Sequence, residues 1–345
     1  MGADPEISVV VGAYRRTEFV ERAITSVLAQ TLPRSAYEIL VVTDFDASSL
    51  RERFAPDGVR FLRDGEPHIG RWLLGAIRQT RAPVLAILDD DDELEPERLA
   101  EALAVFRAHP EVGLYRNRVL PIDGEGRPIR EREWRSIDLD AEIEHRGSVL
   151  IPPRDPKALG PFLTEDGSVA LSASTMIVRR DVLDGASGDA FALTSLPDFA
   201  FLVLAATRPS AIYLDARRLT RYRLHASNAS VRAGQWRIAI DGHAALASVA
   251  RARGRDDLAG WLDRFSVHYD RLYRGETVVM GVREHASRRT VVKDALSYLQ
   301  FLGRHPAERR ARLDVWSAPL YAGGYVVLPG LARWIAQARP TARRD

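Results

Sequence analysis

Four consecutive aspartates, Asp89, Asp90, Asp91 and Asp92, directly follow an aliphatic run at residues 84–88. A short run of this composition predicts a buried parallel strand, so the carboxylates would emerge at its C-terminal edge, where open α/β sheets bind ligands. Four adjacent like charges repel one another, and a small divalent cation such as Mg²⁺ or Mn²⁺ is the simplest way to hold several of them together. The alternative is a solvated acidic turn before the helix that begins near residue 96. The pattern therefore indicates either a metal site or a turn at a strand end.

The composition limits the classes of protein to which the chain can belong. Its 345 residues are 46% hydrophobic and 28% charged, as expected of a globular protein with a sizeable core. A formal net charge of +2 argues against a main role in nucleic-acid binding. The absence of cysteine excludes disulfides, thiolate metal sites and a cysteine nucleophile. The first residues carry no basic segment followed by an apolar stretch, so we expect a cytoplasmic protein.

An uncharged segment at residues 315–332 leaves a contact with the membrane open. Its prolines and glycines disfavour a spanning helix. Arginines flank it on both sides, at positions 309, 310, 312 and 333. The segment could pack onto the protein, or lie peripherally on the anionic inner face of the membrane with the arginines at the headgroups.

Alternating strand and helix patterns over the first 120 residues supply the elements that must position the aspartates. This alternation predicts an α/β fold with a doubly wound, mostly parallel sheet. The expected strands are residues 7–12, 38–42, 59–62, 84–88 and 112–115. The expected helices are residues 17–30, with Thr17 as N-cap, 69–80 and 97–108.

The later part of the chain has a different pattern. Residues 123–126 predict a hairpin turn, residues 131–160 a polar loop or an acceptor-facing insertion, and residues 198–206 a helix. Short strands are expected at residues 175–178, 211–214 and 219–222, and helices at residues 235–253, 256–273, 290–302 and 307–316. We therefore expect three parts, at residues 1–120, 121–234 and 235–345, of which the last is a helical C-terminal region.

Four stretches in this order resemble the family 2 glycosyltransferases of the GT-A fold. They are residues 7–16 (ISVVVGAYRR), 23–31 (AITSVLAQT), 88–96 (LDDDDELEP) and 220–230 (TRYRLHASNAS). The last is similar to a YRxHxxNxS segment that many members carry. The resemblance covers residues 6–118 closely and then returns at the fourth stretch. It implies that residues 1–120 are a nucleotide-sugar-binding half and residues 121–234 an acceptor-binding half that completes the catalytic domain.

The resemblance implies a divalent cation, Mn²⁺ or Mg²⁺, that bridges the phosphates of a nucleotide-sugar and stabilises the departing oxygen. By position, Asp89 and Asp90 would lie near the ribose and phosphates, and Asp91 would reach the metal. His225 matches a histidine that approaches the metal and diphosphate from the far side.

The resemblance also implies where the base of the donor is recognised. The turn Gly12-Ala13-Tyr14-Arg15 is similar to the family's PTYN turn, where backbone groups meet the nucleoside and the tyrosine ring can lie against it. Ala13, Tyr14 and Arg15 are therefore candidate donor-binding residues. Three of the four positions differ from the family's turn, since Gly12-Ala13 replaces Pro-Thr and Arg15 replaces Asn, which leaves the donor open.

The second strand ends in Val41-Val42-Thr43-Asp44, which resembles the family's VVDD. Asp44 falls where the family's base-reading carboxylate lies, able to accept the N3 proton of uracil or thymine. Arg71, at the start of a predicted helix, is a further candidate for base or phosphate binding, and a solvated helix residue would explain it equally well.

An inverting transfer needs a carboxylate that takes the proton of the acceptor hydroxyl. In the family this base usually lies in a Glu-Asp pair at a helix start, ahead of the YRxH segment. Pro197-Asp198 occupies that place, and proline suits a helix start. Asp198 is therefore the expected base, with a helix-capping role as the alternative and Glu165-Asp166 as the fallback pair.

Together these residues predict a metal-dependent, inverting glycosyltransferase that uses a UDP- or dTDP-sugar and a hydroxyl acceptor, namely a glycan, a lipid-linked glycan or a small natural product. Two alternatives stay open. One is a sugar-1-phosphate nucleotidyltransferase, which shares the sheet but wants a glycine-rich phosphate loop. The other is a nucleotide-sugar-binding module without catalysis. A P-loop NTPase is excluded, because no GxxxxGK[ST] stretch is present.

Overall fold

The computed structural model describes residues 4–14, 16–66, 68–129, 141–163, 172–194, 196–225, 235–283, 287–305, 319 and 322. The chain divides into two compact units. The first comprises Met1–His225 and Asp241–Leu262, and the second comprises Ala226–Ile240 and Asp263–Asp345. The predicted division into residues 1–120, 121–234 and 235–345 stays a prediction.

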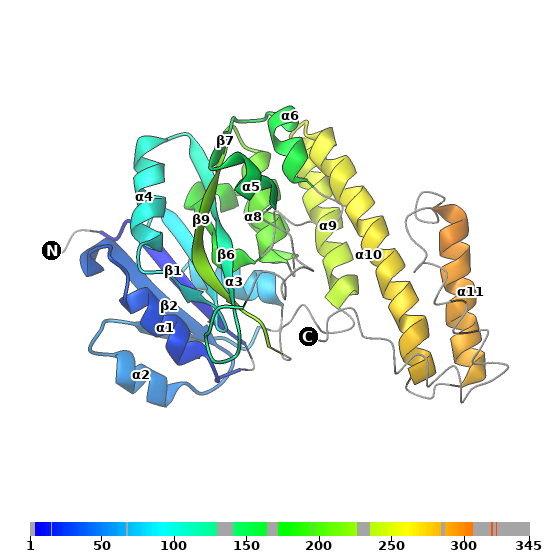
Figure 1. Ribbon diagram of the computed structural model, residues 1–345, viewed down its shortest axis with the longest axis horizontal. Coiled ribbons are helices and arrows are strands. Elements are labelled where there is room, and N and C mark those ends of the chain that lie inside the picture. Colours follow the sequence, from blue (N-terminus) through cyan, green and yellow to red (C-terminus); the bar gives the residue numbers. More distant parts are fainter. Residues whose placement is uncertain are drawn as a thin grey trace. The chain divides into compact units, whose positions relative to one another are not determined.

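A single mixed sheet organises the first unit (Figure 1). Its strands are β1 (Ile7–Ala13), β2 (Tyr37–Thr43), β3 (Arg60–Arg63), β4 (Val84–Asp89), β5 (Glu93–Leu94), β6 (Val112–Ile122), β7 (Val149–Ile151), β8 (Met176–Arg179) and β9 (Ala211–Arg223). The order is β3-β2-β1-β4-β8-β6-β9-β5, and β7 also pairs with β9. Strands β3, β2, β1 and β4 are parallel, β8 runs antiparallel to β4 and β6, and β6 and β9 are parallel. The predicted α/β class with a mostly parallel sheet is confirmed.

Helices cover both faces of this sheet. They are α1 (Val20–Leu28), α2 (Ser48–Phe54), α3 (Ile69–Ile77), α4 (Arg98–Ala108), α5 (Ala141–Arg146), α6 (Pro156–Leu159), α7 (Ala186–Ala192) and α8 (Pro197–Ala206). Side chains of α1, α2 and α4 share one apolar core with Val9 and Val11 of β1. Helix α3 contacts β1 on the opposite face, and α8 contacts β6, β8 and β9. The central strands are therefore buried on both sides, as their continuous aliphatic runs require.

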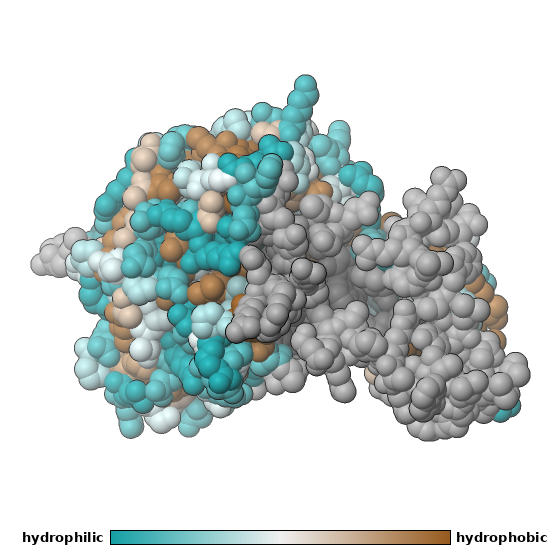
Figure 2. Space-filling model, viewed as in Figure 1, coloured by the Kyte–Doolittle hydropathy of each residue, from teal (hydrophilic) through white to brown (hydrophobic). Residues whose placement is uncertain are grey.

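The helical C-terminal region consists of α9 (Gln235–Ala252), α10 (Asp256–Arg283) and α11 (Arg288–Arg304). Within the second unit, Val278 and Val282 of α10 share a core with Tyr298 and Leu302 of α11. Figure 2 shows a face whose described surface is largely hydrophilic with separate hydrophobic patches. Among the described residues, no helix is long and apolar enough to cross a membrane. The predicted helix at residues 307–316, and all of 315–332 except residues 319 and 322, lie outside the described residues, so the membrane contact stays a prediction.

Helix α1 begins later than the sequence suggested. It starts at Val20 with Phe19 as N-cap, so Thr17 is not the cap. Val20, Ala23, Ile24 and Val27 are its buried stripe, with the spacing of an amphipathic helix. The predicted helix start was wrong because the residues between β1 and α1 contact other parts of the carboxyl edge instead of continuing the helix.

Two other elements differ from the prediction. Helix α2 was missed, because of its residues only Phe54 is buried and no apolar period marks it. Residues 211–214 and 219–222 are parts of one strand, β9, whose pairing with β6 shifts register near Arg118. In residues 131–160, predicted as a loop or an acceptor-facing insertion, the described part contains α5, β7 and α6.

We predict opposite effects on stability for two glycines of α3. At Gly70, an added Cβ would lie 2.6 Å from the backbone oxygen of Thr194 and would also clash with that of Phe191. Gly70→Ala should therefore lower the free energy of unfolding by about 1 to 3 kcal/mol. At Gly75, the same atom would lie 3.6 Å from Asp64 Oδ2, an ordinary contact, so Gly75→Ala should raise it by about 0.5 to 1 kcal/mol. Urea titrations of the two variants measure both; equal effects would contradict the close approach at Gly70.

Candidate active site

The candidate site lies at the carboxyl edge of the parallel strands. Tyr14 follows β1, Asp44 follows β2, and the four aspartates begin with the last residue of β4. The backbone N–H of Asp90 still donates to the carbonyl of Gly12 at 3.2 Å, so the aspartate loop stays attached to the end of β1. The sequence prediction that these segments meet at one edge is therefore correct.

Three of the aspartates form a group that could hold a metal ion. One carboxylate oxygen each of Asp89, Asp91 and Asp92 lies within 4.8 Å of the other two. Oxygen ligands of this kind suit Mg²⁺ and Mn²⁺, so the donor set fits the predicted cation. Asp92 belongs to this group, although it was not predicted as a ligand, and Asp90 lies outside the group.

Burial dominates the acid–base behaviour of the group. It raises the pKa of Asp89 and of Asp90 to about 7, and the pKa of Asp92 well above its ordinary value. The charge of Asp91 adds to the rise in all three. Burial favours a higher pKa for Asp91 too. The hydrogen bond with His225 and the charge of Arg16 outweigh the effect of burial, so the pKa of Asp91 is lowered. The loop therefore holds protons near neutral pH that a bound cation would release.

Arg16 and His225 both contact Asp91. Arg16 Nη1 lies 2.5 Å from Asp91 Oδ2, and Arg16 Nη2 lies 2.5 Å from Asp90 Oδ1. His225 Nε2 lies 3.0 Å from the same Oδ2 of Asp91. His225 therefore contacts Asp91, and its predicted place beside the metal and diphosphate stays a prediction, whereas the ion pairs of Arg16 were not predicted.

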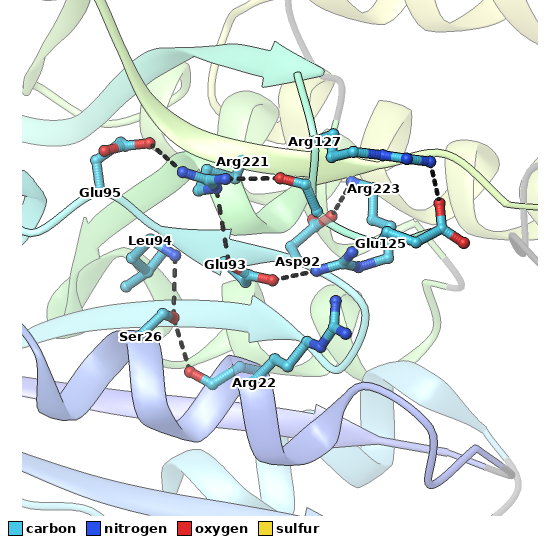
Figure 3. Close-up of polar contacts among 12 residues, drawn as sticks. Arg22, Ser26, Asp92, Glu93, Leu94, Glu95, Glu125, Arg127, Arg221 and Arg223 are labelled. Carbon is cyan, nitrogen blue, oxygen red and sulfur yellow. Dashed lines mark hydrogen bonds and ion pairs between the residues drawn. The ribbon is translucent and has the colours of Figure 1, made fainter. Parts of the chain in front are cut away.

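Arg223, at the end of β9, ties the aspartate loop to the rest of the sheet. Its side chain is 0% exposed; Nε donates to the carbonyl of Asp91 and its backbone N–H donates to Asp92 Oδ1, at 2.9 and 3.0 Å. The guanidinium also pairs with Glu93 and lies over the ring of Phe19, 4.7 Å from its centroid. Figure 3 shows Arg221 and Arg223 of β9 facing the acidic residues of the β5 segment. In the sequence, Arg223 was noted only as part of the YRxH segment, and no role was predicted for it.

Two serines ahead of β8 complete the support of the loop. The backbone N–H of Asp89 donates to Ser174 Oγ at 3.0 Å, and Ser172 Oγ donates to Asp92 Oδ2 at 3.3 Å. Ser172 has a φ of 57° and a ψ of 118°, a strained conformation for a residue other than glycine. Strain of this kind persists only where surrounding contacts impose it. No sequence signal marked these serines.

Asp198, the predicted base, is the second residue of α8 and lies near the aspartate loop. Its carboxylate accepts from the backbone N–H of Phe199 at 2.9 Å and from the backbone N–H of Ser172. Burial, with a contribution from the charge of Asp89, raises its pKa to about 7. Ser172 therefore contacts both Asp198 and Asp92. The fallback pair, Glu165 and Asp166, lies outside the described residues.

The predicted base-binding residues have different surroundings. Ala13 is buried in β1, and Tyr14 is partly buried with its ring edge-on to Trp72 at a centroid distance of 6.3 Å. Asp44 is partly exposed at the end of β2, and Arg71 is exposed in the first turn of α3. Arg15 lies outside the described residues. These positions leave the predicted roles untested.

Comparisons with known proteins agree on a family and a fold. The model of the family described as Glycosyl transferase family 2 matches residues 8–185, more than half of the chain. A curated relative from Nostoc sp. strain PCC 7120, named uncharacterized glycosyltransferase alr2836, is 28% identical over 144 residues, which are 40% of this chain and 44% of the relative. The chain thus matches less than half the length of that relative.

Two solved structures resemble the chain over most of its length. One is Staphylococcus aureus TarS 1–349 in complex with UDP-GlcNAc, with a TM-score of 0.60, 14% identity, and coverage of 93% of this chain and 91% of that chain. The other is the mannosyltransferase PcManGT from Pyrobaculum calidifontis in complex with GDP-Man and Mn²⁺, with a TM-score of 0.50, 16% identity, and coverage of 97% and 84%. At these identities the likeness concerns the fold, and it confirms the predicted GT-A fold.

We predict that the aspartate loop depends on Arg223 for its stability. Arg223→Met would leave Glu93 and the carbonyl of Asp91 without their buried partner, which should lower the free energy of unfolding by about 3 to 5 kcal/mol. Arg127→Gln is the matched control, because Arg127 pairs with Asp123 and Glu125 in solvent and its loss should leave the urea midpoint almost unchanged. Similar midpoints for the two variants would show that Arg223 is not the anchor.

Proposed function

The chain belongs to glycosyl transferase family 2, and from this membership we propose that it is a metal-dependent, inverting glycosyltransferase that moves a sugar from a nucleoside-diphosphate donor to a hydroxyl acceptor. The membership also supports the enzyme class that the sequence predicted. UDP- or dTDP-sugars are the favoured donors.

The observation that carries the proposal is the proximity of Asp198 to the aspartate loop. Ser172 donates to Asp198 through its backbone and to Asp92 through its hydroxyl, and the charge of Asp89 acts on Asp198. A carboxylate whose pKa is about 7 is partly ionised at neutral pH, and it is also basic enough to take the proton of a hydroxyl group as that group reacts. A base and a phosphate-binding group at one edge are what an inverting transfer requires.

In the proposed reaction, Asp198 removes the proton of the acceptor hydroxyl as its oxygen bonds to the anomeric carbon of the sugar. The bond from that carbon to the phosphate oxygen breaks on the opposite side, and the nucleoside diphosphate leaves. Asp89, Asp91 and Asp92 would hold the divalent cation. When bound, this cation supplies positive charge that stabilises the departing diphosphate. His225, whose Nε2 lies 3.0 Å from Asp91 Oδ2, would approach the cation and the diphosphate from the far side.

Base recognition is proposed for the ends of β1 and β2. Tyr14 would lie against the nucleoside, and Asp44 would accept the N3 proton of uracil or thymine. The solved structures with UDP-GlcNAc and GDP-Man support a nucleotide-sugar as the donor class. Ala13, Arg15, Asp90 and Arg71 remain proposed donor contacts, and residues 121–234 the proposed acceptor-binding part.

We predict that a nucleoside diphosphate stabilises the protein only together with the cation. In a thermal-shift screen of UDP, dTDP, GDP and CDP with and without Mn²⁺, a ligand at about a hundred times its dissociation constant adds about 2.7 kcal/mol, a shift of a few degrees. Asp91→Ala should remove the shift, because Asp91 is one of the three grouped carboxylates. A nucleotide shift that is indifferent to Mn²⁺ would favour a binding module without metal-dependent catalysis.

We predict that Asp198→Asn abolishes transfer while donor affinity stays within a few-fold. The measurement is release of nucleoside diphosphate from the donor sugar with a panel of hydroxyl acceptors. Asp189→Asn on α7 is the control, because Asp189 is an exposed carboxylate. Because Asp198 must be ionised to accept a proton, the wild-type rate at saturating donor and metal should level off above pH 7 and fall about tenfold per unit below it. Equal loss of affinity and transfer in Asp198→Asn would assign the base elsewhere.

A further inference from the structure

The turn after β1 places a permanent positive charge on the proposed metal ligand. Arg16 Nη1 and Asp91 Oδ2 are 2.5 Å apart, and Arg16 Nη2 and Asp90 Oδ1 are 2.5 Å apart. We propose that Arg16 competes with the divalent cation for Asp91 and thereby couples binding of the cation to binding of the nucleoside diphosphate. This inference rests on the proposed function and assigns a role to a residue that was not among the predicted site residues.

The competition follows from the number of partners of one oxygen. Asp91 Oδ2 is contacted both by Arg16 and by His225 Nε2, which lies 3.0 Å away. A carboxylate oxygen has two lone pairs, and Arg16 and His225 occupy both of them. A cation that binds through this oxygen must therefore displace one of these two side chains. A cation bound through the other oxygen of Asp91 would still lie close to the guanidinium charge and be repelled by it.

Arg16 is the partner that gives way. Its guanidinium is charged at every accessible pH, so a divalent cation on Asp91 repels it, whereas a neutral imidazole can stay. The Arg16 side chain is 19% exposed and that of His225 is 11% exposed. The ring of His225 also packs on Phe19, with 5.1 Å between the ring centroids. Arg16 lies in the short connection between β1 and α1, outside regular structure.

The diphosphate is the natural second partner of the displaced guanidinium. Arginine binds phosphate oxygens with two parallel hydrogen bonds, and its planar group suits them better than a lysine would. Arg16 is two residues from Tyr14, in the turn proposed to meet the nucleoside. A bound diphosphate would draw Arg16 away from Asp91 and so tighten the cation, and by linkage the cation would tighten the diphosphate equally.

The test is a titration of Mn²⁺ alone at pH 8, with the free ion measured by electron paramagnetic resonance. Arg16→Gln removes the charge and keeps a polar side chain. Arg60→Gln is the control, because Arg60 makes a comparable ion pair with Glu38, 3.0 Å long, at the other end of the strands. Arg16→Gln should bind Mn²⁺ at least about fivefold more tightly than wild type, and Arg60→Gln should match wild type.

The second arm repeats the titration with UDP, and in parallel with GDP. The nucleotide should tighten Mn²⁺ binding by about tenfold in wild type and in Arg60→Gln, within the usual range of coupling between sites. In Arg16→Gln this tightening should fall to about twofold or less. The readout is binding alone, so no acceptor is needed.

Several results would overturn the inference. Unchanged Mn²⁺ affinity and unchanged coupling in Arg16→Gln would show that Arg16 does not compete. Weaker Mn²⁺ binding in Arg16→Gln, with the circular dichroism spectrum and urea midpoint of wild type, would show that Arg16 supports the aspartates instead. Failure of wild type and both variants to bind Mn²⁺ would reject the metal-dependent function itself, and the inference with it.

Discussion

The candidate site depends on one buried cation, the guanidinium of Arg223. A buried arginine is stable only where acceptors surround it, and here they come from two segments of the chain. The carbonyl of Asp91 and the carboxylate of Glu93, after β4, and the carbonyls of Asp123 and Gly124, after β6, all accept from it. Because Arg223 joins these two segments, the end of β9 determines where the loop after β4 lies.

The aspartate loop differs from Arg223, whose buried positive charge is surrounded by acceptors. The loop carries more negative charge than its buried surroundings neutralise. Three of its four carboxyl groups have raised pKa values, with burial as the main cause. Arg16 supplies part of the missing positive charge. The charge of Asp92 also acts on Arg98, which is fully buried at the start of α4, although burial lowers the pKa of Arg98 to about 10. The fold thus holds together a group of acidic side chains whose excess negative charge a bound cation would neutralise.

Local patterns were sufficient for the parts of the fold that bury aliphatic runs. Strands β1 and β4 and the position of the aspartates could be predicted, because a continuous apolar run needs no partner to be recognised. Strand β9 was predicted as two pieces, because its middle is polar and part of its pairing is with distant residues, such as Tyr115, which donates to Asp215 at 2.7 Å. Ser172 and Arg16 were missed for the same reason. Their contacts join residues 80 and 75 positions apart, which no local pattern records.

The chain position of Arg223 has a consequence for synthesis on the ribosome. Arg223 follows Asp91 by 132 residues, so at typical rates of 5 to 20 residues per second the aspartates emerge roughly 7 to 26 s before their anchor. During this interval β1, β2 and β4 can pair, whereas the acidic loop has neither β9 nor the serines ahead of β8 to hold it. The nascent protein therefore acquires its Rossmann-like half first, and the final arrangement of its aspartates forms only when the last strand joins the sheet.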